Sequence, residues 1–505
     1  MSQLSFQSLD ESILHDLSVQ SWRRGIVNFF AESIPFSFSS SNEYAELVIE
    51  IIQSFATRLN QSLNIVEFGA GNGVFAKKCI QKLTDKEFSF HYLVTENSPS
   101  LVADFDSISI VRHSNNVATK LVDIHNVQLE QPFHVGILTY LLDTFPVKTL
   151  ELKEGQLFEW KVAVDVKKDA VLKFVQDGEL VVWNKDAIES WLADPIEESM
   201  LPVLSRVHEC LDIHWQAFEC SALALDPTGI LNDWLQKQSH DDHGFFNFSS
   251  SWWSLLDSLQ QQVTDHFMLL FYDFAANSAT QFSTCPESFG RFGVCYFYSI
   301  PFFLLQEYCD RANLQFIVSD FPNSDNQMGI LTSLKSMAFK SEVVSFFNRT
   351  EPGQDVYNYT LKIQDSDSVD SCLALVREAK QRLTFDQQSD YVFLFSIAAK
   401  LYDLKCYDQV IYYTDFILFD YGYLSLNAII LKAKALRKNG FVQDALSLVD
   451  MGITYVPTYD LLYLEKVFIA QELNQMDVMK EALILYFQFA MVNPQWRLLD
   501  LLQSL

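Results

Sequence analysis

The spacing of hydrophobic residues divides the sequence into an earlier part of mixed strands and helices and a later part of helices alone. Over residues 42–59 apolar side chains recur every three or four positions, which predicts an amphipathic helix. Short apolar runs typical of buried strands lie at 64–68, 90–96, 107–113 and 133–138. Helical spacing follows the first of these runs, and such strand–helix alternation favours a doubly wound parallel sheet.

Two β-hairpins are predicted after the fourth strand. The first turns through Glu154 and Gly155, and the second, over residues 171–183, turns at Asp177 and Gly178. An Asp-Gly pair between alternating apolar residues is a strong signal for a two-residue hairpin turn. The fold class is therefore α/β, a Rossmann-like sheet with added hairpins.

A polar linker is predicted over residues 348–371. It begins with turn-forming residues, and a strand-like alternation at 356–363 lies inside it. Beyond the linker only helical spacing is found, which predicts an all-α C-terminal domain.

That C-terminal part repeats itself. Tyr407 matches Phe441 in the next copy, and a third copy follows with an extra offset of three positions. Ala445 precedes Pro457 at a spacing that recurs in the third copy. A helix pair with a period of about 34 residues that ends in proline resembles the tetratricopeptide repeat. Such arrays usually bind peptides or proteins on a concave surface; the alternative is that three repeats only cover the preceding domain.

A glycine-rich turn joins the first strand to the helix after it. Glu67 precedes the turn, and Gly69, Gly71 and Gly73 alternate along it. Glycine lets the backbone approach a ligand closely at a helix N-terminus. Glu96 ends the second strand, close to the usual separation from such a turn for an acid that accepts hydrogen bonds from both hydroxyls of a ribose. The alternative is a turn that only reverses the chain.

The glycine spacing separates two classes of nucleotide cofactor. A dinucleotide site would use G-x-G-x-x-G, whereas this loop reads E-F-G-A-G-N-G. The loop resembles motif I of S-adenosylmethionine-dependent methyltransferases, in which the acid and the loop backbone hold the methionine end of the cofactor. This resemblance implies S-adenosyl-L-methionine as the cofactor.

The segment after the fourth strand is similar to the MidA family, which includes the mitochondrial complex I assembly arginine methyltransferase. The residues that match the family's Asn-Glu-Leu-Leu-Asp-Ala-Leu-Pro-Val segment in register are Leu141, Leu142, Asp143, Pro146 and Val147. Shorter similarities extend in order over residues 35–350. The resemblance implies a class I methyltransferase sheet and methyl transfer to a protein.

Two residues depart from the family's segment. Thr139 and Tyr140 stand where the family has Asn-Glu, and a carboxylate there would orient a guanidinium and offset its charge. Asp143 remains as a candidate substrate-facing acid, and the alternative for it is a helix cap or a local backbone contact. Tyr140 either lines the methyl-transfer pocket or only packs. Asp143 and Tyr140 are the catalytic candidates.

The predicted cofactor-binding set combines the turn with the strand ends. It comprises Glu67, Gly69, Ala70, Gly71, Gly73, Glu96 and Asp123. No metal site is predicted. His240, Asp241, Asp242 and His243 are adjacent in a polar loop, and adjacent ligands seldom define a metal site without distant partners.

Composition narrows the classes of partner. A net charge of −28 repels phosphate backbones, which argues against nucleic acid and favours a basic protein substrate or partner, unless the acid serves solubility alone. The eight cysteines form no Cys-x-x-Cys pair, which fits a reducing cytoplasm rather than a disulfide framework. The first residues do not resemble a signal peptide, and no apolar run is long enough to span a membrane.

Three domains are expected: an N-terminal helical segment at 1–62, a methyltransferase-like domain at 63–365 and a repeat domain at 366–505. Two functions stay open. The first is an S-adenosylmethionine-dependent methyltransferase that acts on a protein, with arginine as a candidate acceptor and the repeats binding a partner. The second is a catalytically degenerate scaffold whose repeats bind a protein. Methylation of a small molecule is a third, weaker option.

Overall fold

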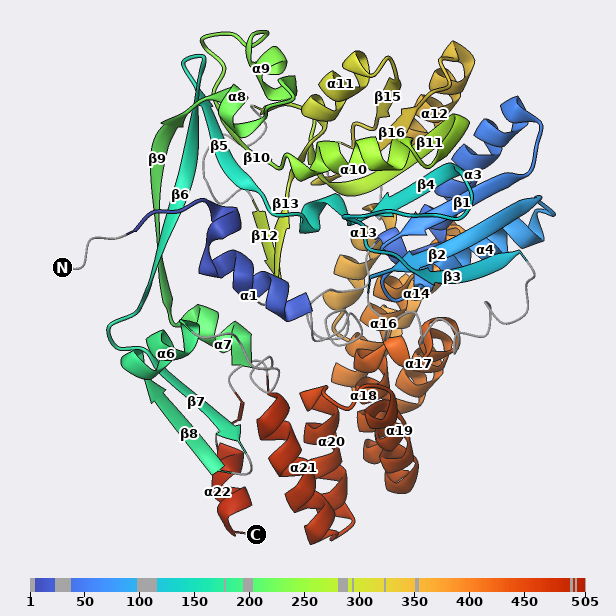
Figure 1. Ribbon diagram of the computed structural model, residues 1–505. Coiled ribbons are helices and arrows are strands. Elements are labelled where there is room, and N and C mark those ends of the chain that lie inside the picture. Colours follow the sequence, from blue (N-terminus) through green and yellow to red (C-terminus); the bar gives the residue numbers. More distant parts are fainter. Residues whose placement is uncertain are drawn as a thin grey trace. The chain divides into compact units, whose positions relative to one another are not determined.

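The structure, a computed structural model, divides into two compact units (Figure 1). The first unit comprises Met1–Ser18, Tyr44–Val164 and Ile213–Pro352, and the second comprises Val19–Glu43, Asp165–Asp212 and Gly353–Leu505. The residues that the structure describes are 5–22, 38–97, 116–176, 179–193, 203–279, 289–292, 295–321, 324–349, 354–490, 494–495 and 497–504. The predicted domain boundaries stay a prediction, because the compact units do not follow the order of the chain.

A mixed sheet forms the centre of the first unit. Its strand order is β15-β16-β11-β4-β1-β2-β3, and short β14 (Ile300–Pro301) pairs with β11 outside this path. The strands of the path are β1 (Leu63–Phe68), β2 (Phe90–Glu96), β3 (Val117–Leu121), β4 (Phe133–Thr139), β11 (Val263–Ala276), β15 (Gln315–Val318) and β16 (Asn326–Thr332). All neighbouring pairs from β11 to β3 are parallel, whereas β16 runs antiparallel to both of its neighbours. The Rossmann-like fold class is confirmed.

The order of the strands defines where a ligand is expected. From β1 the chain adds β2 and β3 on one side of the sheet, and then β4 and β11 on the other. The direction of strand addition therefore reverses between β1 and β4. In open α/β sheets ligands bind beyond the carboxyl ends of the strands at such a reversal point.

Most of the elements predicted for this region are present. The helix predicted at 42–59 is α3 (Asn42–Leu59), and it buries Tyr44, Val48, Ile51 and Phe55 at helical spacing. The strands predicted at 64–68, 90–96 and 133–138 are confirmed as β1, β2 and β4. The strand predicted at 107–113 lies outside the described residues, and the strand beside β2 is β3.

Several helices and short elements occur along the chain between residues 9 and 349. They include η1 (Leu9–Glu11), α1 (Ile13–Trp22), η2 (Phe38–Ser40), α4 (Val74–Asp85), η4 (Leu142–Thr144), α10 (Ser251–Gln260), α11 (Phe302–Arg311) and α12 (Met337–Arg349). Helix α4 contacts β2, and α11 and α12 contact β15. Among the described helices, none combines the length and the hydropathy needed to cross a membrane.

A four-stranded sheet contains the first predicted hairpin. Its order is β10-β5-β6-β9, from β5 (Lys148–Lys153), β6 (Gln156–Val166), β9 (Leu211–Cys220) and β10 (Gly244–Phe248). Strands β5 and β6 pair antiparallel across Glu154 and Gly155, whose φ angles of 53° and 74° are both left-handed. Two left-handed central residues are the mark of a type I′ turn, so this hairpin prediction is confirmed. A separate two-stranded pair is formed by β12 (Phe289–Phe292) and β13 (Cys295–Tyr298).

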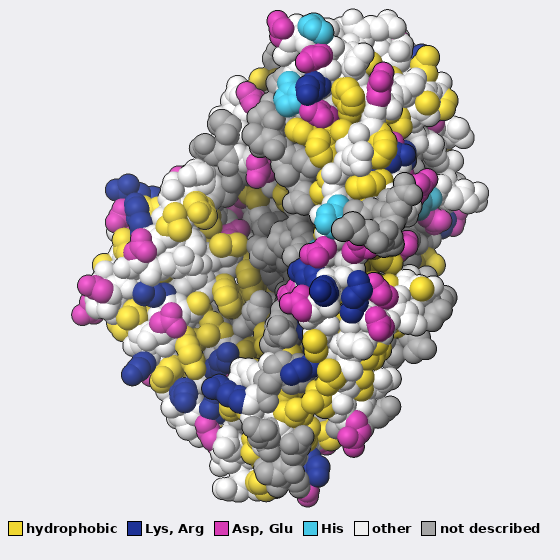
Figure 2. Space-filling view, turned by 90° about the vertical axis from the view of Figure 1, so that its left-hand side faces the viewer, with side chains coloured by type: hydrophobic (Ala, Val, Ile, Leu, Met, Phe, Trp, Pro, Cys, Tyr) yellow, Lys and Arg dark blue, Asp and Glu magenta, His cyan; other side chains and the backbone are white. Residues whose placement is uncertain are grey.

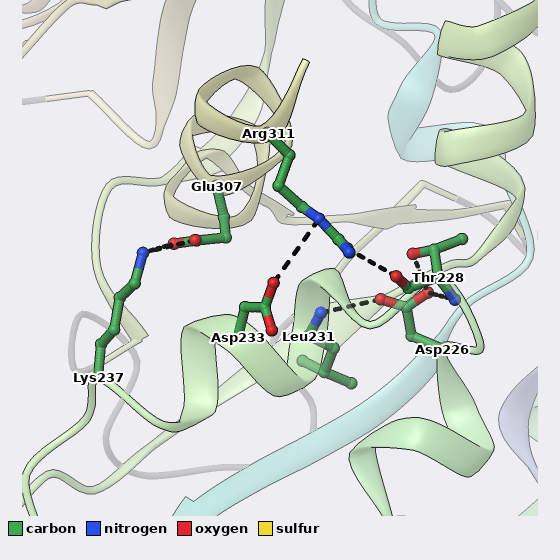
Figure 3. A network of polar contacts seen from close by, with 7 residues as sticks. All are labelled: Asp226, Thr228, Leu231, Asp233, Lys237, Glu307 and Arg311. Carbon is green, nitrogen blue, oxygen red and sulfur yellow. Dashed lines mark hydrogen bonds and ion pairs between the residues drawn. The ribbon is translucent and has the colours of Figure 1, made fainter. Parts of the chain in front are cut away.

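Polar contacts hold one insertion against helix α11 (Figure 3). The insertion contains α8 (Ala222–Leu225) and α9 (Ile230–Leu235). The buried carboxylate of Asp226 accepts hydrogen bonds from the Thr228 hydroxyl and amide at 2.5 and 3.1 Å. Arg311 of α11 donates to the Thr228 carbonyl at 2.6 Å, and Glu307 of the same helix pairs with Lys237 at 2.5 Å. These contacts hold the insertion that leads into β10 and α10.

The second unit contains the second predicted hairpin as well as the C-terminal helices. Strands β7 (Val171–Gln176) and β8 (Glu179–Asn184) pair antiparallel, which confirms the hairpin; its turn at Asp177 and Gly178 lies outside the described residues. Val175 of β7 is buried in one apolar cluster with Tyr463, Val467 and Tyr486. This hairpin therefore packs with helices that lie much later in the sequence.

The helices of the second unit occur in pairs. They are α6 (Lys185–Leu192), α7 (Leu204–Glu209), α13 (Gln354–Gln364), α14 (Val369–Arg382), α15 (Phe385–Gln388), α16 (Tyr391–Asp403), α17 (Tyr407–Tyr421), α18 (Leu426–Lys438), α19 (Val442–Tyr455), α20 (Asp460–Glu472), α21 (Met476–Phe489) and α22 (Arg497–Ser504), with η7 (Gly422–Leu424) after α17. The strand-like reading of 356–363 is wrong, because this segment is α13. Its buried residues Val356, Tyr359, Thr360 and Ile363 follow helical spacing, and short apolar patterns of this kind fit both periods.

The helix pairs α16–α17, α18–α19 and α20–α21 follow one another at a nearly constant interval. Their second helices start at positions 407, 442 and 476, so successive starts are almost evenly spaced. A left-handed residue precedes each of these helices, namely Lys405, Gly440 and Asn474. The predicted extra offset in the third copy is therefore wrong. An all-helical region of paired helices is confirmed, and its assignment as tetratricopeptide repeats stays a prediction.

Candidate cofactor-binding site

The glycine turn lies directly after β1, at the reversal point of the sheet. Gly69, Gly71 and Gly73 have φ angles of 64°, 59° and 72°, in the left-handed region that favours glycine. A Cβ atom on Gly69 would lie 3.0 Å from the Leu141 Cδ1 atom. Gly73 is the N-cap of α4, so the N-terminus of this helix lies at the glycine turn. The backbone is thus shaped for close approach by a ligand.

The acid that ends β2 reaches this turn. Glu96 is buried, and one of its carboxylate oxygens accepts a hydrogen bond from the Gly71 amide at 2.9 Å. Its other oxygen accepts from the Asn97 amide at 2.7 Å. Glu96 therefore holds the turn in place.

Glu67, the acid before the turn, is buried at the end of β1. The Tyr92 hydroxyl donates to its carboxylate at 2.6 Å. Burial raises the pKa of Glu67 to about 8, the Tyr92 hydrogen bond opposes this shift, and the nearby Glu96 charge adds to it. A cationic ligand beside Glu67 would offset the cost of ionising it.

Ala70 and Asp123 occupy different surroundings. The Ala70 amide donates to the Thr95 carbonyl at 2.9 Å, which fastens the turn to β2. Asp123 follows β3 and is exposed, and its carboxylate accepts a hydrogen bond from the His125 amide at 2.9 Å. Ala70 therefore lies within the glycine turn, whereas the Asp123 carboxylate stabilises a separate turn after β3.

Tyr140 continues from the end of β4 with a left-handed φ of 48°, which is unusual for a residue with a side chain. Its ring packs against Tyr272 and Phe274, with centroid distances of 5.5 Å to each. Its amide donates to the Tyr272 carbonyl at 2.9 Å. These contacts correspond to the packing alternative of the sequence analysis, at a strained position beside the reversal point.

Two buried aspartates lie at the ends of β4 and β11. Asp273 accepts hydrogen bonds from the amides of Leu142, Asp143 and Phe274 at 3.2, 3.4 and 3.0 Å. Among the described residues, neither carboxylate oxygen of Asp143 has a hydrogen-bond partner, and the residue is 0% exposed. A buried carboxylate without partners is costly, so this side chain is a place where a ligand contact is expected.

The two carboxyl groups are electrostatically linked. Burial raises the pKa of Asp143 to about 8. Burial also raises the pKa of Asp273, and the charge of Asp143 adds to this shift. Neighbouring carboxylates cannot both ionise cheaply in a buried site, so the pair retains a proton near neutral pH.

The sequence analysis missed several residues of this region. Tyr44 of α3 shares a 3.0 Å hydrogen bond with the Thr139 hydroxyl, and its ring packs on Tyr272. Trp252 of α10 is buried and donates from its indole nitrogen to the Leu142 carbonyl at 3.1 Å. Asp273 carries a usable signal, because it directly follows an apolar run, residues 267–272, of the kind that is typical of a buried strand. Nothing in the local sequence points to Trp252.

The polar loop at 239–243 contacts β5 through His243. His243 is 2.9 Å from the Glu151 carboxylate of β5. Within the described residues, no group of three or more histidine, cysteine, aspartate or glutamate side chains is arranged to hold a metal ion.

Comparison with known families gives a match over just under half of the chain. Residues 45–287 match the family described as "Putative S-adenosyl-L-methionine-dependent methyltransferase". This segment is similar to that methyltransferase family. The resemblance to MidA-like methyltransferases is thereby confirmed, and S-adenosyl-L-methionine is the cofactor of the family. No curated protein matches the chain in sequence.

Solved structures similar to the chain are distant from it. One is a protein of Burkholderia thailandensis bound to S-adenosyl-homocysteine, with 13% identity and a TM-score of 0.37, covering 63% of this chain and 75% of that chain. A native structure from the same organism has 11% identity and a TM-score of 0.36, covering 63% and 74%. The N-methyltransferase NodS of Bradyrhizobium japonicum has 6% identity and a TM-score of 0.24, covering 56% and 84%.

Proposed function

We propose that this methyltransferase-family protein transfers a methyl group from S-adenosylmethionine to a nitrogen of a basic protein substrate, with arginine as the candidate acceptor. The observation that carries the proposal is the buried pair Asp143, in η4 just after β4, and Asp273, near the end of the adjacent strand β11. Buried acids without compensating cations favour a positively charged ligand group.

The residues of the turn fit the cofactor. The backbone of the turn forms a cradle that consists of Gly69, Ala70, Gly71 and Gly73. A side chain at Gly69 would crowd Leu141. Glu96 accepts hydroxyl hydrogen bonds, and Glu67 offsets positive charge. The bound cofactor supplies an electrophilic methyl group. Asp123, exposed beyond β3, is proposed as an outer contact of the same site.

On the acceptor side, Asp143 binds the substrate nitrogen. A bound guanidinium would favour the ionised form of Asp143. The carboxylate oxygens, which have no partner among the described residues, can then accept hydrogen bonds from the guanidinium and take up the proton that the nitrogen loses on methylation. Asp273 holds the backbone of this turn through three amides, and Tyr140 packs beside it. Positioning of the acceptor then provides most of the rate.

A second function has one observation in its favour. Tyr140 stands at the position of the family's Glu, and its ring is packed between aromatic neighbours instead of offering a carboxylate. On this alternative the domain is a catalytically degenerate scaffold and the helical repeats bind a protein partner. The proposed domain division is 1–62, 63–365 and 366–505, with the last domain acting as the partner-binding part in either case.

The cofactor site is tested by calorimetry with S-adenosylmethionine. We expect the Gly71→Arg variant to lose binding, because its side chain would enter the turn and its backbone is left-handed. Gly440→Arg is a matched control, since Gly440 is also left-handed but has open space around it, and Lys405 and Asn474 occupy the equivalent repeat position. Equal binding by wild type and Gly71→Arg would remove the site from the turn.

Catalysis is tested by incubating the protein and cell lysate with methyl-labelled cofactor. Labelled protein bands that disappear with Asp143→Asn support the enzyme. If the wild type binds cofactor but labels no protein, the scaffold function replaces the enzyme.

A further inference from the structure

Helix α17 exposes three aromatic side chains on one side. Tyr412, Phe416 and Phe419 are 47%, 49% and 90% exposed, and their spacing of four and three residues places them along one face of the helix. The rings of Tyr412 and Phe416 contact each other edge to face at 4.9 Å. Clustered apolar side chains on a surface mark sites of protein interaction more often than single ones do.

The neighbouring repeats show that stacking does not require these aromatics. Counted from the N-caps Cys406, Phe441 and Gln475, the same three positions can be compared in the second helix of each pair. These positions hold Ser447, Met451 and Thr454 in α19, and Glu481, Leu485 and Gln488 in α21. The register is supported by a repeated ion pair, Lys432–Asp415 at 2.5 Å and Lys466–Asp450 at 2.7 Å. The aromatic face is thus particular to α17.

The charge around this face is negative. Helix α17 contains Asp408, Asp415 and Asp420 and neither lysine nor arginine. Lys432 pairs with Asp415, which still leaves the helix with an acidic surplus. The face of the molecule in Figure 2, by contrast, carries basic, acidic and apolar side chains side by side. An acidic and aromatic surface is complementary to lysine and arginine, which pair with carboxylates and also pack on aromatic rings.

We propose that the outer face of α17 binds an amphipathic helix of a partner protein, whose lysine and arginine side chains flank an apolar stripe. The apolar stripe covers Tyr412, Phe416 and Phe419, and the basic side chains face the three aspartates. This inference rests on the partner-binding part of the proposed function and not on its cofactor part.

The test replaces the three exposed aromatic side chains of α17 with the residues found at the equivalent positions of α19. The variant Tyr412→Ser/Phe416→Met/Phe419→Thr gives α17 the outer residues of α19, all at exposed positions. The probe is a fluorescent amphipathic helix of lysine and leucine, about 18 residues or five turns long. By fluorescence anisotropy we expect the full-length variant to bind at least about tenfold more weakly than wild type, which corresponds to about 1.4 kcal/mol.

Three controls make the result specific. Met451→Ser changes the equivalent exposed position of α19 and should bind the probe like wild type. A glutamate–leucine peptide should not bind, and added salt should weaken binding of the lysine–leucine peptide. Circular dichroism and the melting temperature of the triple variant should match those of wild type.

The inference is wrong if the triple variant binds the probe as tightly as wild type, or if the acidic peptide binds equally well. It is also wrong if sedimentation shows a wild-type dimer that the triple variant converts to monomer, because a second copy would then occupy the face. Calorimetry with S-adenosylmethionine on the triple variant should be unchanged, so failure here is separate from failure of the cofactor site.

Discussion

At the scale of single residues, the most unusual feature is the carboxyl group of Asp143, which is buried without a hydrogen-bond partner among the described residues. Asp273 is satisfied by three backbone amides, whereas the oxygens of Asp143 have no partner among the described residues. A protein that needed only a turn at this point could use a neutral residue at lower cost. The arrangement is easier to understand if a charged ligand group completes it.

The raised pKa of Asp143 predicts how stability depends on pH. Because its folded-state pKa of about 8 lies above the ordinary aspartate value of about 4, the folded protein binds more protons between these limits. The stabilising contribution of the protonated group is fully present below about pH 4 and is lost as pH rises to about 8. We expect wild type to lose about 4 kcal/mol more stability between pH 5 and pH 8.5 than Asp143→Asn does, at about 1.4 kcal/mol per pH unit up to pH 8.

Thermal melts over this pH range measure the effect. Asp123→Asn is the control, because it makes the same chemical change at an exposed side chain. If Asp143→Asn and wild type show parallel pH profiles, Asp143 is not buried as a protonated acid.

A second prediction at this scale concerns Trp252, a positioning residue. Its indole donates to the Leu142 carbonyl and so holds the turn that carries Asp143. We expect Trp252→Phe to lower stability by about 1–2 kcal/mol and methyl transfer by about tenfold, with cofactor binding retained. Trp253→Phe is the matched control, since the buried Trp253 indole nitrogen has no partner among the described residues. Equal effects from the two variants would contradict a positioning role for Trp252.

At the scale of elements, the helix pairs are joined by one buried ion pair as well as by apolar packing. Arg437 of α18 donates to Glu465 and Glu472 of α20 at 2.8 and 2.5 Å, and the Glu465 side chain is 1% exposed. Removal of the cation would leave a buried carboxylate without compensation, which is more damaging than loss of an exposed pair.

We therefore expect Arg437→Met to lower the free energy of unfolding by about 3 kcal/mol in urea titrations followed by circular dichroism. The double variant Arg437→Met/Glu465→Met should recover most of this loss, because it removes both charges. Lys432→Met breaks the more exposed pair with Asp415 and should cost no more than about 1 kcal/mol. Similar losses for Arg437→Met and Lys432→Met would show that burial of the pair has no energetic consequence.

At the scale of the whole molecule, two compact units share the chain in alternation. The hairpin β7–β8 belongs to the second unit, and Val175 takes part in its apolar core. A truncation before the C-terminal helices would expose that core, so the two units are better separated by their thermal transitions than by deletion.

We expect calorimetric scans to show two unfolding transitions, of which S-adenosylmethionine raises only one. At a cofactor concentration about 100 times the dissociation constant, the stabilisation of that transition should be about 2.7 kcal/mol. Gly71→Arg should abolish the shift and leave the other transition unchanged. A single transition that shifts as a whole would mean that the units unfold together.

The agreement between sequence and structure depends on how local each feature is. The glycine turn and the Glu154-Gly155 hairpin were predictable, because a left-handed backbone limits the residues that can occupy it. The segment 356–363 was misread, because a short apolar pattern fits a strand and a helix alike. The register of the third repeat was missed, since it is defined by helix starts and not by matching side chains.

The sequence by itself therefore determined most of the strands and helices of the first unit, the glycine turn after β1 and the all-helical C-terminal region, because these depend on spacing within a few residues. Only the tertiary structure decided that Asp273 holds the turn of Asp143, which is distant in the sequence, and that Trp252 supports it from α10. It also decided that the aromatics of α17 face solvent. These features depend on which distant segments pack together, and a periodic pattern shows that a face is apolar without showing what covers it.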